Sequence, residues 1–408
     1  MPAVTHRKDR RRPPMSQAPL WTKDFILVSF LNFLAVLVFY LLVVVMGVYA
    51  TEELGATSSQ AGLAVGMFVV GVLAGRLLVG QYIDFLGRRR TLVAGLFLSI
   101  VTIGAYFLPV GIGGLVVFRF LHGASIGIAA TAMGTIVAFL IPSARKGEGI
   151  GYYSMSSTLA TATGPFIGMF MTTHTSFSHV LWLCLAVSSL SFLACWALKV
   201  PEVTAEDRAA IPRKFSVRRL VAAEAVPICG VIFVLGIFYS GVLSFLNAYA
   251  RELDLVAAAS FFFVAYSVAI LISRPFTGRL LDLRGANLVM YPAFVLMVAG
   301  FGLLGMASEG WHLWLAGGLI GLGFGNSQSC IQAVALKIVD HHKMGLATAT
   351  FFIFLDAGLG FGPYFLGLVV PMLGYASLFE CVAGLVVVCA IGYAIAYGRI
   401  ASKVQKQV

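Results

Sequence analysis

Twelve apolar segments, each long enough to cross a lipid bilayer as a helix, follow one another along the 408-residue chain. A helix needs about 20 predominantly apolar residues to span the hydrocarbon core. Charged residues make up only 11% of the chain, whereas soluble domains carry roughly 25%. The sequence therefore predicts an all-α membrane protein whose spans lie at approximately 25–49, 59–79, 91–109, 113–141, 150–172, 178–199, 226–248, 257–278, 287–307, 311–337, 345–371 and 375–398.

A repeat with a fixed offset of 198 residues divides these segments into two halves. Four residues recur with unchanged spacing: Arg76, Gly80, Asp84 and Gly87 correspond to Arg274, Gly278, Asp282 and Gly285. A Gly-Pro pair keeps the offset, at Gly164-Pro165 and Gly362-Pro363. Such a repeat predicts two pseudo-symmetric six-helix bundles, as in many transporters. We expect a cytosolic tail, a first bundle, a cytosolic linker, a second bundle and a second tail, at 1–20, 21–199, 200–225, 226–399 and 400–408.

Arginine and lysine gather on one side of the predicted membrane. With a cytosolic N-terminus, basic clusters such as Arg88-Arg89-Arg90 fall inside, and Arg251 is the one basic residue outside. This positive-inside bias predicts a multi-pass protein of the inner (plasma) membrane with both termini cytosolic. It explains the net charge of +11 without nucleic-acid binding, and it favours contact with anionic membrane lipid.

The cysteine and histidine patterns predict no metal site. All six cysteines fall within predicted helices and lack close pairing, so we expect them to pack as apolar residues. His341-His342 lies in a loop, where a solvated pair or a pair of metal ligands are both conceivable; we favour the first. We expect no cleavable signal peptide, because the first apolar run is too long and lacks a small-residue cleavage site.

The first copy of the repeated segment carries a family resemblance. Gly80-x-x-x-Asp84-x-x-Gly87-Arg88-Arg89 resembles the loop 2–3 signature of the major facilitator superfamily. Membership would imply two bundles around a central cavity that opens alternately to each side, and a loop that latches the bundles on the cytosolic side. Asp84 would then lie near the N-terminus of the eleventh span, where the helix dipole favours an anion. Without the repeat, the charges of this segment could be read as serving only to set the membrane topology.

The second copy departs from this signature. Gly285 is followed by Ala286-Asn287 rather than by basic residues. We therefore expect the latch of the second half to be weaker than that of the first.

Two further segments resemble motifs of the same family. Arg119-x-x-x-Gly123-x-x-x-Gly127 is similar to the motif of the fourth span that is linked to proton transfer. Its arginine is expected to face a cavity or a partner, because a charge in hydrocarbon is costly; snorkelling to the headgroups is the alternative. His122 is either a packing histidine or part of a proton relay.

Gly164-Pro165-x-x-Gly168 resembles the motif of the exporter (antiporter) branch. The match is partial, since Ala160 and Ala162 stand where the longer motif has glycine. The resemblance implies export.

Asp356 is the one acidic residue that the sequence places at membrane depth. Burial raises a carboxyl pKa, which brings proton exchange toward physiological pH. Its repeat counterpart is Thr158, so the scaffold does not require an acid there. The alternative is an Asp356 permanently bound to an amide of the tenth span, such as Gln328 or Gln332.

Together these observations predict a secondary active transporter, not an enzyme. We expect it to export a small organic molecule (a drug, sugar or metallophore-like metabolite) in exchange for protons. The predicted cavity lining is Asn32, Tyr40, Arg119, Tyr239, Asn326, Gln328, Gln332 and Asp356. Proton coupling is assigned to Asp356, Arg119 and His122. The latch and hinge set comprises Arg76, Gly80, Asp84, Gly87, Arg88, Gly164, Pro165, Gly168, Arg274, Gly278, Asp282, Gly285, Gly362 and Pro363.

Other classes fit less well. The glycine-rich 317–325 segment predicts close helix packing or a bend. It does not follow a strand, so we do not expect it to be a phosphate-binding loop for ATP-driven transport. A membrane enzyme or receptor would need clustered histidines or acids, or an output domain. A proton-coupled importer of an anionic nutrient, with Arg119 as counter-charge, stays open. No cofactor or metal is expected, and the partners are a small-molecule substrate, protons and lipid around a monomer.

Overall fold

The computed structural model describes residues 19–56, 58–80, 82–200, 221–340 and 343–404. Within these ranges the regular elements are all helical, as expected for a chain whose backbone must satisfy its own hydrogen bonds in lipid. The first bundle consists of α1 (Lys23–Glu52), α2 (Ser58–Gly80), α4 (Arg88–Ala105), α5 (Ile112–Leu140), α6 (Lys146–His174) and α7 (Phe177–Ala194). Short helical turns lie at α3 (Ile83–Leu86), η2 (Ser143–Arg145) and η3 (Cys195–Ala197).

The second bundle repeats this plan. It consists of α9 (Val226–Glu252), α10 (Val256–Arg284), α11 (Asn287–Gly305), α12 (Gly310–Ile320), α13 (Asn326–Lys337) and α14 (Met344–Val404). A π-helical turn, η5 (Gly321–Gly325), joins α12 to α13. Gly374 (φ 76°) divides α14 into two helices. The predicted segment 311–337 covers α12, η5 and α13 together, and each other predicted segment coincides with one helix or with half of α14. Nine helices of the described residues are long and apolar enough to span a membrane.

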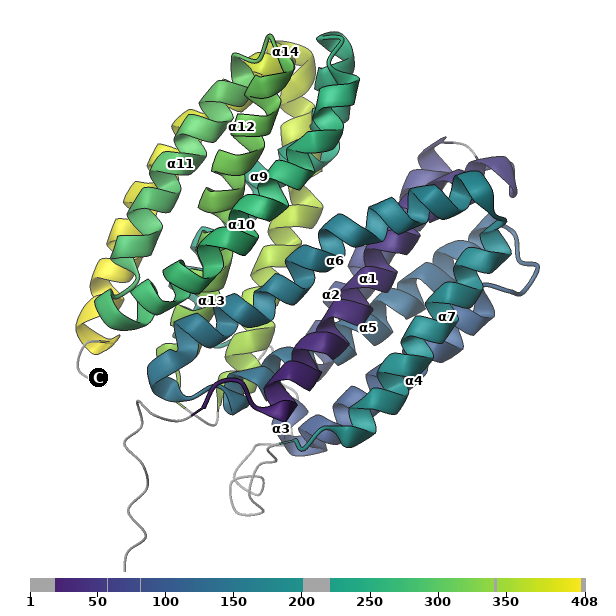
Figure 1. Cartoon of the computed structure of the whole chain (residues 1–408), viewed down its shortest axis with the longest axis horizontal. Coiled ribbons are helices and arrows are strands. Elements are labelled where there is room, and N and C mark those ends of the chain that lie inside the picture. Colours follow the sequence, from purple (N-terminus) through teal and green to yellow (C-terminus); the bar gives the residue numbers. More distant parts are fainter. Residues whose placement is uncertain (1–18, 57, 81, 201–220, 341–342, 405–408) are drawn as a thin grey trace, which may run out of the picture.

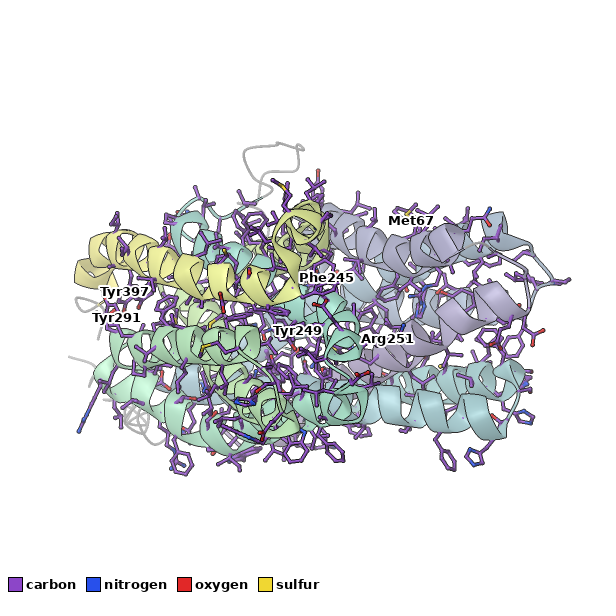
Figure 2. The ribbon with its side chains drawn as sticks, turned by 90° about the horizontal axis from the view of Figure 1, so that it is seen from above. Met67, Phe245, Tyr249, Arg251, Tyr291 and Tyr397 are labelled. Atoms are coloured by element: carbon purple, nitrogen blue, oxygen red, sulfur yellow. The ribbon has the colours of Figure 1, made fainter. Side chains whose placement is uncertain are left out.

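The two bundles meet at one end and diverge toward the other (Figure 1). We call the meeting end the junction end; it holds the starts of α1, α6 and α14 and the end of α10. Side chains fill each bundle, and Tyr291 and Tyr397 lie together at the junction end of the second bundle (Figure 2). Their rings flank Tyr393, at centroid distances of 5.8 and 5.3 Å, the kind of aromatic group found at membrane interfaces.

The repeat offset is preserved in backbone geometry. Gly87 (φ 94°) and Gly285 (φ 83°) both turn the chain in a left-handed conformation, which glycine adopts without a steric penalty. Contacts follow the same offset: a Cβ on Gly123 would touch the carbonyl of Phe68, and one on Gly321 would touch that of Tyr266. The two bundles are therefore copies in space as well as in sequence.

Candidate functional site at the bundle junction

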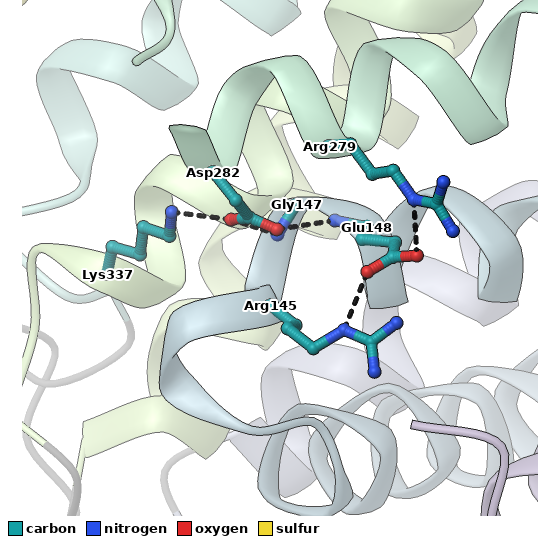
Figure 3. A network of polar contacts seen from close by, with 6 residues as sticks. All are labelled: Arg145, Gly147, Glu148, Arg279, Asp282 and Lys337. Atoms are coloured by element: carbon teal, nitrogen blue, oxygen red, sulfur yellow. Dashed lines mark hydrogen bonds and ion pairs between the residues drawn. The ribbon is translucent and has the colours of Figure 1, made fainter. Parts of the chain in front are cut away.

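An ionic network joins the bundles at the junction end (Figure 3). The Asp282 carboxylate of α10 accepts the backbone N–H groups of Gly147 and Glu148, both at 2.8 Å, in the first turn of α6. Lys337 of α13 lies 2.7 Å from the same carboxylate. A carboxylate at a helix N-terminus is favoured by unpaired N–H groups and by the helix dipole. Asp282, in the second copy that was expected to make the weaker latch, thus has three polar contacts, two of them to the other bundle.

Glu148 adds a second tie between the bundles. Its carboxylate lies 2.7 Å from Nε of Arg145 and 2.9 Å from Nε of Arg279 in α10. Burial of Glu148 opposes ionisation, but the hydrogen bonds from the two arginines outweigh it and lower the pKa of this carboxyl. Sequence reasoning missed Glu148, because a single acid in a basic loop looks like one of the charges that only set membrane topology.

Close backbone contact between α6 and α10 accompanies these bonds. A Cβ on Gly278 would lie 2.7 Å from Cα of Glu148 and 2.7 Å from the carbonyl oxygen of Gly147. A comparable close contact occurs between α2 and α14, where a Cβ on Gly80 would lie 2.7 Å from Cβ of Ala349. The repeat counterpart of Ala349 is Gly151, which itself faces Gly278. Two equivalent crossings therefore hold the junction end together.

A buried ion pair lies above the α2–α14 crossing. Nε of Arg76 is 2.8 Å from Oδ2 of Asp356, with side-chain exposures of 8% and 16%. The N–H is not aligned with that oxygen, so the contact is an ion pair rather than a linear hydrogen bond. The guanidinium also lies 4.3 Å from the ring centroid of Phe352. Asp356 is thus paired with Arg76 of the other bundle, and the alternative of a permanent bond to Gln328 or Gln332 is wrong.

Aromatic side chains continue this site toward the middle of the molecule. Tyr239 stacks on Tyr266 and Phe324, at centroid distances of 5.2 and 4.3 Å. Tyr40 of the first bundle lies within electrostatic reach of both tyrosines and of Asp356. Tyr40 and Tyr239 thus lie where the two bundles face one another, and Tyr266 joins them without a signal in the sequence.

Two of the predicted cavity amides are occupied by structural hydrogen bonds. Asn32 donates to Ser156 and Ser157, both at 2.8 Å, and accepts from Tyr153 at 3.0 Å. Asn326 likewise bridges α13 to α10, donating to Ser273 at 2.9 Å. Both are buried. Their prediction as cavity residues is corrected, because neighbouring side chains use up the amide groups.

The other two predicted amides of α13 differ from Asn326. Gln328 is half-buried. Gln332 is buried, and its Nε2 atom has no partner among the described residues.

Arg119 and His122 are enclosed in the first bundle. Arg119 has no exposed surface; its Nε donates to the carbonyl of Ala64 at 3.2 Å, and its guanidinium lies 4.7 Å from the ring centroid of Phe68. His122 Nδ1 is 3.2 Å from the hydroxyl of Tyr106. In this conformation Arg119 therefore does not line the space between the bundles, since α2 and α4 cover it. Snorkelling is excluded for the same reason.

The hinge residues fit closely against their neighbours. A Cβ on Gly164 would lie 2.7 Å from Cβ of Tyr40, and one on Gly168 would lie 3.1 Å from the carbonyl of Leu41, so α6 packs tightly on α1. Gly362 packs in the same way against Ser240. Pro363 lies within α14.

Some predicted residues and segments fall wholly or partly outside the description. The side chains of Asp84 and Pro165 lie outside the described ones, as do His341-His342, most of the linker and the first eighteen residues. Arg88 is buried against the ring of Phe139, 3.5 Å from its centroid. No group of three or more metal-binding side chains occurs among the described residues.

Two repeated six-helix bundles with buried ionic contacts between them define an integral membrane carrier. The family model described as "Major Facilitator Superfamily" matches residues 28–363 and 228–407. The chain belongs to the major facilitator superfamily, and the predicted fold class is thereby confirmed.

Relatives and solved structures agree with this assignment. An uncharacterised MFS-type transporter of Methanocaldococcus jannaschii is 23% identical over 351 residues, covering 82% of this chain and 88% of that protein. The uncharacterised MFS-type transporter YhhS of Escherichia coli O157:H7 is 25% identical over 370 residues, covering 88% of each chain. The fold is similar to the crystal structure of the human organic anion transporter MFSD10 (TM-score 0.73, 17% identity, covering 93% and 100%) and to the proton:xylose symporter XylE (TM-score 0.70, 14%, covering 91% and 95%).

Proposed function

We propose that this protein is a proton-coupled secondary transporter that exports a small organic molecule by alternating access, with Asp356 as its proton-carrying group. The observation that carries the proposal is the ion pair between Arg76 and Asp356. The two residues belong to different bundles, so the pair exists only while the junction end is closed. Opening that end must separate a carboxylate from its counter-charge inside the membrane.

Protonation of Asp356 lowers the cost of that separation. A neutral carboxyl no longer attracts the guanidinium, and it does not need a counter-ion when the bundles part. The side chain of Asp356 keeps 16% of its surface accessible, so it is not sealed from proton exchange. Proton binding at Asp356 and opening of the junction end are thus linked, and the linkage is reciprocal.

Export is inferred from the close packing of α6 on α1. Gly164 and Gly168 both lie against backbone or Cβ atoms of α1, which accounts physically for small residues in the segment that resembles the exporter motif. The positive-inside bias supports a cytosolic location for the junction end and for both termini. The conformation described here then faces the exterior, in the inner (plasma) membrane, and a monomer suffices for transport.

A second candidate, import of an anionic nutrient, has its own support. Three guanidinium groups at membrane depth, those of Arg76, Arg119 and Arg274, are accompanied by one carboxylate, Asp356, among the described helices. The excess of positive charge favours an anionic substrate. The name of one fold neighbour, an organic anion transporter, points the same way.

Vesicle transport separates these possibilities. A thermal-shift screen of the purified protein against drugs, sugars, metallophores and organic acids first identifies a ligand. Uptake of that ligand into inverted vesicles, with and without an imposed pH gradient, then reports direction and coupling. Acidification of the vesicle lumen should drive uptake by the wild type, whereas Asp356→Asn should bind the ligand but ignore the gradient. A full response of Asp356→Asn would place the coupling group elsewhere.

A further inference from the structure

The guanidinium of Arg274 is a buried cation without a counter-charge among the described residues. Arg274 lies in α10 and is 2% exposed. Its Nη2 donates to the carbonyl of Gly325 at 3.4 Å, a long hydrogen bond, and its Nε and Nη1 have no partner in the part of the chain that the structure describes. An unpaired arginine inside a membrane is energetically costly. Such a residue calls for a partner that the described chain does not supply.

The repeat indicates where the partner is missing. Arg274 is the counterpart of Arg76, whose partner is Asp356. The counterpart of Asp356 is Thr158, which has no charge and whose hydroxyl donates to the carbonyl of Ser154 at 3.3 Å within its own helix. Because the Gly80–Ala349 and Gly278–Gly151 contacts follow the same offset, the repeat predicts that position 158 faces Arg274 as position 356 faces Arg76. The second half keeps the cation and lacks the anion.

We propose that a carboxylate of the transported molecule pairs with Arg274 beside Thr158, so that the substrate is an organic acid. The inference rests on the proposed transport function and names its substrate class. A carboxylate suits the position, because guanidinium and carboxylate groups form strong charge-assisted hydrogen bonds. For Arg76 the protein itself supplies that carboxylate, from Asp356, and for Arg274 the substrate supplies it.

The surroundings of Arg274 favour an apolar or aromatic body for this acid. Tyr266 interacts electrostatically with Arg274. Its ring stacks on Tyr239, which stacks on Phe324. Tyr40 brings the first bundle to the same cluster and lies within reach of Asp356. An acid bound at Arg274 would therefore lie between both bundles and near the proton-carrying residue.

Arg119 fits this role less well, although its Nη1 and Nη2 are also unpaired. The contacts that the structure gives Arg119 are with Ala64, Phe68 and Tyr106 of the first bundle. A ligand there would lie inside one bundle and would not sense the separation of the two.

The charge-filling variant Thr158→Asp tests the geometry without a ligand. If position 158 faces Arg274, the new carboxylate pairs with it, and the purified protein should melt at a higher temperature than Thr158→Asn, which has nearly the same shape and no charge. A Thr158→Asp protein that melts below Thr158→Asn would contradict the proposed arrangement.

Binding to the full-length protein in nanodiscs tests the substrate class. The probes are benzoate, phenylacetate and indole-3-acetate, each compared with its amide. The acids should stabilise the wild type more than the amides. Arg274→Gln should weaken acid binding by roughly tenfold or more, Arg274→Lys should weaken it less, Thr158→Asp should abolish it, and Thr158→Asn should retain it. Wild-type affinity in Arg274→Gln or Thr158→Asp, or no stabilisation by any acid, would overturn the assignment.

The two proposals fail separately. Acids that bind through Arg274 but do not respond to a pH gradient would leave the Arg274 site standing and remove proton coupling. A neutral substrate that is driven by the gradient through Asp356 would do the reverse.

Discussion

The carboxylate of Asp282 accepts the backbone N–H of Glu148 at 2.8 Å, so a residue of the second bundle caps a helix of the first. The cap exists only while the bundles touch at the junction end. Charge-assisted hydrogen bonds of this kind contribute roughly 1.5–3 kcal/mol each. They stabilise one of the two conformations of a carrier rather than the fold as a whole.

Replacement of Asp282 by asparagine should therefore slow transport without unfolding the protein. The amide retains one acceptor oxygen but loses the ion pair with Lys337. Transport rate and melting temperature are the two measurements, and Asp340→Asn, an exposed acid at the same end, is the control. Wild-type transport by Asp282→Asn would show that the cap does not limit turnover.

A side chain at Gly278 should shift the protein toward the conformation with an open junction end. In Gly278→Val the new carbon atoms would collide with the backbone of α6, and backbone cannot move aside cheaply. Accessibility of a single cysteine placed in the first turn of α6 to a membrane-impermeant thiol reagent measures the shift, after Cys381, the exposed native cysteine, is replaced by serine. Gly230→Val is the control, since a Cβ there meets nothing within 4 Å.

The Arg76–Asp356 pair should show strong coupling in a double-mutant cycle. Asp356→Asn alone leaves a buried guanidinium without its counter-charge, and breaking a buried pair in this way costs about 3–5 kcal/mol. The double variant Arg76→Gln/Asp356→Asn removes both charges and should be more stable than Asp356→Asn alone. Additive losses in denaturation experiments would mean that the two groups do not interact in solution.

Lys146 predicts a pH dependence at the junction end. It is the first residue of α6, before the apolar span that begins near residue 150, and its ammonium donates to the carbonyl of Ala138. Burial, aided by Lys337 and opposed by Asp282, lowers the pKa of Lys146 from 10.5 to about 8. The unfolded chain therefore holds this proton at pH values where the folded protein has released it, so stability contributed by Lys146 rises between about pH 8 and 10.5.

The measurement is the denaturation midpoint at pH 7 and at pH 9.5. The midpoint of the wild type should rise more between pH 7 and pH 9.5 than the midpoint of Lys146→Met does, because the variant lacks the titrating group. Lys199→Met, which removes an exposed lysine, should keep the wild-type difference. An equal gain in Lys146→Met and wild type would assign the effect to other groups.

The spans and the repeat were predictable because they depend on patterns that a sequence displays directly. Apolar length identifies a span, and a constant offset identifies a duplication, as Gly87 and Gly285 demonstrate with their matching backbone turns. Pairing across the bundles was not predictable in the same way. The sequence pattern assigned Arg76 to the latch. In the structure Arg76 lies four residues before the end of α2, at the level of Asp356 in α14, and pairs with that residue. A comparison of depths along both helices would have suggested the pair.

The polar residues illustrate a second limit. Asn32 and Gln332 are both amides within predicted membrane spans. Neighbouring hydroxyl groups accept hydrogen bonds from Asn32, whereas Nε2 of Gln332 has no partner among the described residues. Residue type indicates that a partner is required, whereas only the packing determines which partner it is. Arg119 was predicted to line the cavity because its charge requires a partner, but the packing of the first bundle provides contacts for it inside that bundle.

The excess of buried positive charge has an electrical consequence. As one end of a carrier closes and the other opens, the water-filled faces move past Arg76 and Arg274, so these charges cross part of the transmembrane voltage even if the helices only tilt. Each elementary charge that crosses the whole voltage contributes about 2.3 kcal/mol per 100 mV. An energised membrane would therefore bias the resting orientation of the empty protein, and an arriving anion would cancel part of that bias. Turnover would then be visible as a current.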